Sequence, residues 1–250
     1  MATTAEYLAQ LQADKQTLVD NLVAKGVEAT SDETFTTLAP KVANVSSADF
    51  EINDASYLFN SGARMDVVNE LCSIISPECT NYSNMFIGAK TDSLPIFNCA
   101  NGTNFSYMCY QALNLITFPE INIGNAENIS YMCYNCPKLQ TIPLLDCGKV
   151  TNVSNVLYYC IALTTLGGFK DLGKAYLTSR AENYANYKFD LSYATLLTHE
   201  SLMNVINNLY DIASIGVKPQ SLVIATECQS LLSDDEIAIA TNKGWNVSFA

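Results

Sequence analysis

The chain has 250 residues, enough for a sizeable core, and 49% of them are hydrophobic, which excludes an intrinsically disordered protein. Its 13 basic and 25 acidic residues give a formal net charge of −12. That charge opposes the phosphate backbone, so we expect no nucleic-acid partner. We recognise no signal peptide and no apolar run long enough to span a membrane, so we expect neither export nor membrane insertion.

An amphipathic helix is predicted over residues 4–25. Its stripe has spacings of 3, 4, 3 and 4 residues, as in the a/d seam of a coiled coil: Leu8, Leu11, Lys15, Leu18 and Leu22. A helix of this length is marginal alone, so the stripe must pack on copies of the chain, on another protein, or on the following segment as a helical hairpin. We expect the four leucines to form an oligomerisation or anchoring surface, with a homotrimer as the assembly.

A second, shorter helix is predicted after the first, capped near Thr30 or Ser31. Its apolar positions are Phe35, Leu38 and Val42.

The stretch KQTLVDNLVAKGVEATSDETFTTLAPKVANV, over 15–45, resembles the N-terminal segment of phage and prophage tail or other virion structural proteins. The resemblance implies that residues 1–45 attach the chain to a particle, with other virion proteins as partners. Residues 46–54 are predicted to be a linker.

From residue 80 onwards the sequence repeats every 23–24 residues. Each copy opens on Thr-Asn or Glu-Asn, followed by an apolar residue, a serine and, two residues later, another apolar residue. The copies open at Thr80, Thr103, Glu127 and Thr151. A fainter copy precedes them around 55–59. This period predicts a solenoid in which each coil buries its apolar side on its neighbours.

The repeat bears on the C-x-x-C formed by Cys133 and Cys136. In other copies phenylalanine, leucine or alanine occupies the same two columns, so cysteine behaves as a small buried hydrophobe. The alternative is a metal or redox pair, but zinc would need further cysteines or histidines and the chain has one His. We expect reduced structural thiols, no metal and no cofactor.

Each copy also carries an asparagine in an N-x-S sequon: Asn81, Asn104, Asn128 and Asn152. Buried backbone groups need partners, so we expect a ladder of amides that bonds the backbone where the chain turns, in preference to glycosylation.

Segments such as NISYMCYNCPKLQTIPLLDCGKVTNVSNVLYYC resemble the bacterial-surface-antigen type of leucine-rich repeat, a short-period class common in gut bacteria and their phages. The pattern S-x-M-x-x-x-C/A…L-x-x-I-P covers about 55–175. The resemblance implies an α/β fold: a leucine-rich-repeat solenoid with helices before it and larger strand-helix repeats capping it over 176–250.

Two strand-helix units are predicted in that C-terminal part. A helix from about 198 to 211 has a buried stripe of Leu202, Val205, Ile206 and Leu209, and SLVIAT (221–226) reads as a strand. Ser233 to Glu236 form a capping box that opens another helix, Lys243-Gly244 ends it, and WNVSF follows as a strand.

Tyrosines form two columns of the repeat, Tyr107 with Tyr131, and Tyr110 with Tyr134 and Tyr158. One column would be exposed and would bind a host sugar or protein. The alternative is that these rings fill the outer side of the solenoid without binding anything.

No catalytic grouping is recognisable. His199 is predicted at a helix start, where a solvated role competes with that of a base, and no orienting partner is evident. Glu120 and Asp146 occupy different repeat offsets, so they build no carboxylate pair. We therefore expect no enzyme.

The leading hypothesis is a phage tail or head fibre or appendage, made in the host cytoplasm and located in the virion. The alternative is a bacterial adhesin or interaction scaffold.

Overall fold

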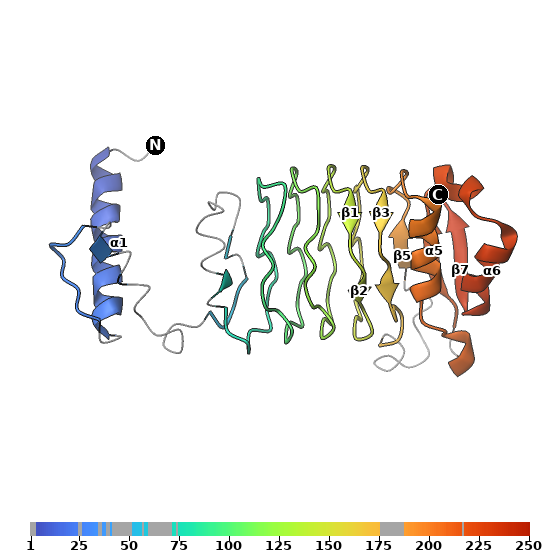
Figure 1. The fold of residues 1–250 in the computed structure, drawn as a ribbon, viewed down its shortest axis with the longest axis horizontal. Coiled ribbons are helices and arrows are strands. Elements are labelled where there is room, and N and C mark those ends of the chain that lie inside the picture. Colours follow the sequence, from blue (N-terminus) through green and yellow to red (C-terminus); the bar gives the residue numbers. More distant parts are fainter. Residues whose placement is uncertain are drawn as a thin grey trace. The chain divides into compact units, whose positions relative to one another are not determined.

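A computed structural model describes residues 4–24, 27–34, 37–38, 41, 52–56, 58–59, 72–73, 75–175, 188–216 and 218–250. The chain forms two compact units, Met1–Glu51 and Ile52–Ala250 (Figure 1). The division falls within the predicted linker, 46–54.

The first unit is built on helix α1 (Thr4–Ala24), close to the predicted bounds. Leu22 and Val19 are buried and pack with the fully buried Leu38 of the following segment. The partly buried Leu18 packs against this cluster. The C-terminal end of the apolar stripe therefore packs within the unit, which is one of the three alternatives that the heptad left open. The side chains of Leu8 and Leu11 lie outside the described residues.

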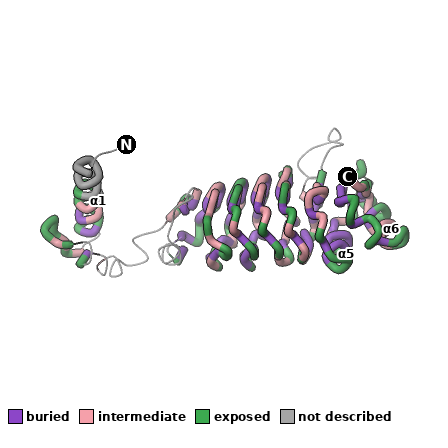
Figure 2. Tube along the Cα trace, turned by 90° about the horizontal axis from the view of Figure 1, so that it is seen from above, coloured by how far each residue is buried: buried purple, intermediate pink, exposed green. Residues whose placement is uncertain are grey.

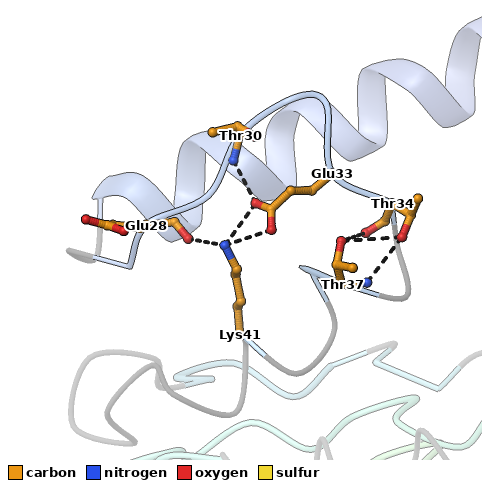
Figure 3. A network of polar contacts seen from close by, with 6 residues as sticks. All are labelled: Glu28, Thr30, Glu33, Thr34, Thr37 and Lys41. Carbon is orange, nitrogen blue, oxygen red and sulfur yellow. Dashed lines mark hydrogen bonds and ion pairs between the residues drawn. The ribbon is translucent and has the colours of Figure 1, made fainter.

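A polar network holds the segment after α1 (Figure 3). Lys41 pairs with the Glu33 carboxylate at 2.8 Å and also donates to the Glu28 carbonyl. Glu33 accepts the backbone N–H of Thr30 at 2.9 Å, and the hydrogen bond from Lys41 does most to lower the pKa of that carboxyl. A charged pair and a satisfied backbone donor thus fix the loop that carries Leu38.

The predicted second helix starts later than expected. Thr34, not Thr30 or Ser31, accepts the N–H groups of Thr37 and Leu38, at 3.1 and 3.0 Å. The Thr30 carbonyl accepts the Glu33 N–H at 3.2 Å, but residues 31–33 form a turn and a bend, and the described helical residues are Thr37 and Leu38. Phe35 and Val42 lie outside the described residues.

The second unit begins with passes of the chain that lie side by side in parallel (Figure 1); each pass of 23–24 residues is called a coil below. Bridges at the start of the coils join Asn81 to Asn104, Asn104 to Asn128, and Asn128 to Asn152. Further bridges run through Ser93, Thr117 and Thr141. Parallel pairs β1 (Thr141–Ile142) with β3 (Thr165–Leu166) and β2 (Leu145–Asp146) with β4 (Phe169–Lys170) extend them. The fainter copy joins this stack, since Ala55 donates its N–H to Asn81 at 2.9 Å.

The repeated apolar columns face into the coils, so that buried and exposed residues alternate along each pass (Figure 2). One column is Met85, Met108, Met132 and Val156, and another is Leu115, Leu139 and Leu163; all are 0–1% exposed. The nine cysteines are free and buried. Cys136 and Cys160 donate their thiols to the carbonyls of Cys109 and Cys133, at 3.1 and 3.0 Å. The burial predicted for these thiols is confirmed.

The predicted asparagine contacts to the backbone are also confirmed. In each coil the asparagine Oδ1 accepts the N–H of the serine two residues later, at 3.0–3.2 Å: Ser83, Ser106, Ser130 and Ser154. The Asn104 amide also donates to Asn81 at 3.2 Å, across one coil step. These bonds satisfy donors where the chain turns away from the parallel bridges.

The C-terminal part is a three-stranded parallel sheet with helices. Strands β5 (Lys188–Leu191), β6 (Gln220–Ile224) and β7 (Trp245–Phe249) pair in sequence order. Helix α5 (His199–Asn208) contacts β3 and β4, and α6 (Asp234–Asn242) contacts α5 and β7. Short 3-10 helices η1 (Ala213–Ile215) and η2 (Thr226–Leu231) complete the connections.

The local signals predicted for these helices are present. Leu202, Val205 and Ile206 are buried on α5, and so is Leu209, the residue that follows the helix. Ser233 and Glu236 form the capping box of α6, whose last residue precedes Lys243. The strands predicted at 221–226 and 245–249 correspond to β6 and β7, respectively.

Candidate interaction surface

The tyrosine columns form two adjacent rows of stacked rings. Tyr107 and Tyr131 are nearly parallel with centroids 4.7 Å apart, and Tyr134 lies 5.0 Å from Tyr110 and 4.8 Å from Tyr158. The rows touch each other, since Tyr107 and Tyr131 are each 5.5 Å from the neighbouring ring of the second row. The repeat therefore brings all five predicted tyrosines into one cluster.

Two tyrosines outside the two repeat columns extend this cluster. The Tyr193 ring lies 4.3 Å from Tyr158, and its hydroxyl donates to the Tyr158 hydroxyl at 3.0 Å. Tyr159 lies 5.7 Å from Tyr193. Tyr159 was adjacent to a predicted position, whereas Tyr193 follows Tyr158 by 35 residues and so breaks the 24-residue period. The tyrosine face is the set Tyr107, Tyr110, Tyr131, Tyr134, Tyr158, Tyr159 and Tyr193.

The tyrosine face is partly open to solvent. Tyr107 is 36% and Tyr159 is 44% exposed, and the other members are half-buried. Desolvation, followed by the neighbouring tyrosines, raises the pKa of the Tyr134 hydroxyl above its usual value. The rings thus pack against one another and also keep accessible surface. This arrangement lies between the two predicted alternatives, one fully exposed column or rings that only fill the outer side of the coils.

Three members of the tyrosine face have a left-handed backbone. The φ angles of Tyr107, Tyr131 and Tyr159 are 59°, 57° and 61°. For most L-residues this conformation costs about 1–2 kcal/mol, and bulky side chains adopt it rarely. In the neighbouring coils Asn84 and Asn155 occupy the turn position of the first two tyrosines, and asparagine tolerates this conformation better.

The tyrosine face lies on a part of the coils that is almost free of charge. The segments 103–119, 128–143 and 151–169 contain a single charged residue, Lys138. The remaining parts of the same coils carry Glu120, Glu127, Asp146, Lys149, Lys170 and Asp171. In a chain with a net charge of −12, the charges of these coils are thus segregated away from their tyrosines. Beyond the coils, Asp190 acts on Tyr193 and pairs with Lys188 at 2.6 Å.

An apolar row borders the second row of tyrosines, three residues further along each coil. Leu113, Ile161 and Leu196 are 51%, 41% and 56% exposed, and the half-buried Pro137 lies at the same offset. Exposed apolar residues that gather beside aromatic rings are typical of surfaces that bind partners.

The structure supplies a neighbour for His199 that the sequence did not reveal. Its Nε2 lies 2.8 Å from the Glu236 carboxylate. Ser233 N–H, the His199 contact and the Ser233 hydroxyl lower the pKa of Glu236 to about 2. The same carboxylate closes the capping box of α6, and His199 is the first residue of α5. The pair therefore joins the starts of two helices, which is a structural role. Over the residues that the structure describes, no group of three or more His, Cys, Asp or Glu is placed to hold a metal ion.

No family model, curated protein or solved structure matches the chain. Within the described ranges, no helix combines the length and apolar character needed to cross a membrane.

Proposed function

We propose that the stack of coils is a leucine-rich-repeat solenoid of the bacterial-surface-antigen type, and that the protein is a phage tail or head fibre or appendage. The tyrosine face would contact the host cell surface, and the N-terminal unit would join the chain to its copies or to other virion proteins. Support comes from the repeat register, the partly exposed aromatic cluster and the resemblance of residues 15–45 to virion proteins.

The tyrosine face is the observation that carries this proposal. A row of side chains repeated at each coil offers several equivalent contacts along one molecule. Several copies on one particle would add avidity, because each further contact forms at a high effective concentration.

The N-terminal unit has a more specific role in the proposal. Leu22 already packs inside the unit against Leu38, so the interface between copies would rest on the partly buried Leu18 together with Leu8 and Leu11. A homotrimer remains the proposed assembly.

Light scattering on the full chain and on a version starting at Ser46 tests the assembly. A discrete oligomer that becomes a monomer on truncation supports it. A monomer in both cases contradicts self-assembly and leaves docking to another virion protein as the role of the N-terminal unit.

Location in the virion is tested separately. An antibody raised against residues 52–250 should detect the protein in purified particles. Its absence from them would favour the alternative, a bacterial adhesin or interaction scaffold.

A further inference from the structure

The left-handed tyrosines occupy positions that the fold does not need to fill with aromatic residues. Each coil has two such turn positions, and the chain places Asn84, Tyr107, Tyr131 and Asn155 at the first. Gly88, Gln111, Asn135 and Tyr159 occupy the second. Glycine and asparagine take this conformation more easily than tyrosine does. The turn itself therefore forms with other residues, and tyrosine at three of the positions strains the backbone.

Core packing does not explain these three tyrosines either. Tyr107 and Tyr159 are the most exposed members of the tyrosine face, at 36% and 44%, and Tyr131 is half-buried. Backbone strain kept at an exposed aromatic residue indicates a requirement for the side chain, which is a common mark of functional positions.

The stacking of the rings restricts what can bind. Within each row the neighbouring rings are parallel to within 11° and lie 4.7–5.0 Å apart, so each covers a face of the next. A parallel ring lies on both sides of Tyr134 but on only one side of Tyr107 and Tyr131. The cluster therefore presents ring edges, hydroxyls and few open aromatic faces on which a sugar ring could stack. The hydroxyls of Tyr107, Tyr110, Tyr131 and Tyr134 form no hydrogen bond to another described residue, so they remain available to a ligand.

The surroundings fit a protein partner. Interface cores between proteins are depleted in charge and enriched in aromatic residues. Binding surfaces rich in Tyr and Asn combine rigid apolar area with adaptable hydrogen bonds. Here Gln111 and Asn135 accompany the tyrosines, the apolar row of Leu113 and Ile161 lies beside them, and charge is nearly absent.

We propose that the tyrosine face docks an uncharged patch of a host-surface protein, with Tyr107, Tyr131 and Tyr159 as contact residues. This inference rests on the proposed host attachment and narrows the receptor to a protein. The stacked rings are already ordered, so binding loses little side-chain entropy, and affinity arises from apolar area and neutral hydrogen bonds.

The test uses the full-length chain with a C-terminal fluorescent tag, incubated with intact cells of a panel of gut bacteria and read by flow cytometry. The key variant is the double substitution Tyr107→Asn and Tyr159→Asn, which introduces residues found at the same turns of other coils. We expect cell binding to fall at least about tenfold. The Tm should change by no more than about 4 °C, because relief of the backbone strain opposes the loss of the ring contacts.

The matched control is the double substitution Ile96→Asn and Leu144→Asn. It also removes two exposed apolar side chains, 74% and 52% exposed, but outside the charge-poor segments. Binding by this control should equal that of the original chain.

The chemistry of the receptor is tested on the cells. Proteinase treatment of the cells should abolish binding by the original chain, and periodate treatment should leave it intact. Because the surface is uncharged, raising NaCl from about 0.05 to 0.5 M should change binding less than about twofold.

Three results would overturn the inference while leaving host attachment standing: equal binding by the tyrosine variant, loss of binding after periodate but not after proteinase, or a strong salt dependence. If the original chain binds no strain in the panel, the proposed attachment function itself is wrong.

Discussion

Replacing Asn128 with alanine removes one step of the asparagine ladder without touching the apolar core. The Asn128 Oδ1 accepts the Ser130 N–H at 3.0 Å and the Ser130 hydroxyl at 2.7 Å. Ser130 is only 5% exposed, so water cannot easily replace the lost acceptor. The substitution therefore leaves a buried backbone donor without a partner.

The cost follows from that unsatisfied donor. A buried N–H without an acceptor costs about 1–3 kcal/mol, whereas the hydroxyl can rotate towards another acceptor. We therefore expect Asn128→Ala to lower the free energy of unfolding by about 2 kcal/mol. For a unit of this size that corresponds to a fall in Tm of roughly 4–8 °C.

The single tryptophan provides the assay. Trp245 in β7 is 1% exposed and donates its indole N–H to the Tyr210 carbonyl at 3.0 Å. Its fluorescence reports exposure of the C-terminal sheet during urea unfolding, and far-UV circular dichroism follows the whole chain in parallel. Coincident transitions would justify a two-state free energy.

The chain contains its own control for this prediction. Asn152 makes the equivalent bond to the Ser154 N–H at 3.1 Å, but Ser154 is exposed, so water can take over. Asn152→Ala should therefore change the free energy of unfolding by less than about 0.5 kcal/mol. Equal losses in the two variants would refute the reasoning, as would a loss below about 0.5 kcal/mol for Asn128→Ala.

Three further predictions concern other parts of the chain. All nine thiols are buried, so a colorimetric aromatic disulfide should label none of them in native protein at pH 8 and nine after unfolding in urea; rapid labelling of the native chain would contradict their burial. Since Ser233 and His199 hold the pKa of Glu236 at about 2, below its usual 4.5, the carboxylate stabilises the fold fully above pH 4.5 and loses this effect as the pH falls towards 2. Thermal melts should therefore show a shallower fall of Tm over that window for Glu236→Gln, and an unchanged slope would argue against the capping role. A Cβ on Gly167 would lie 2.4 Å from the Leu144 backbone nitrogen, so Gly167→Ala should cost at least about 2 kcal/mol in urea unfolding; a neutral result would mean that the two coils separate easily.

The local order of the coils followed from the sequence alone. Asn81, Asn104 and Asn128 recur at the repeat spacing, and each makes the backbone contact expected of it. The same holds for the cysteines among the buried columns and for the capping box at Ser233. In all of these cases the partner lies a few residues away or one period further along the chain, so residue type and spacing were sufficient to predict it.

Contacts that break the period were decided by the tertiary structure. Tyr193 joins the tyrosine face from 35 residues beyond Tyr158, and His199 meets Glu236 from a different helix. Leu22 packs on Leu38, so only the tertiary structure shows what the C-terminal end of the heptad stripe contacts. The left-handed backbone of Tyr107 was also hidden, because tyrosine gives no local signal for that conformation. Such features depend on where separate segments meet in space and on turns that neighbouring coils impose, and neither is encoded by spacing along the chain.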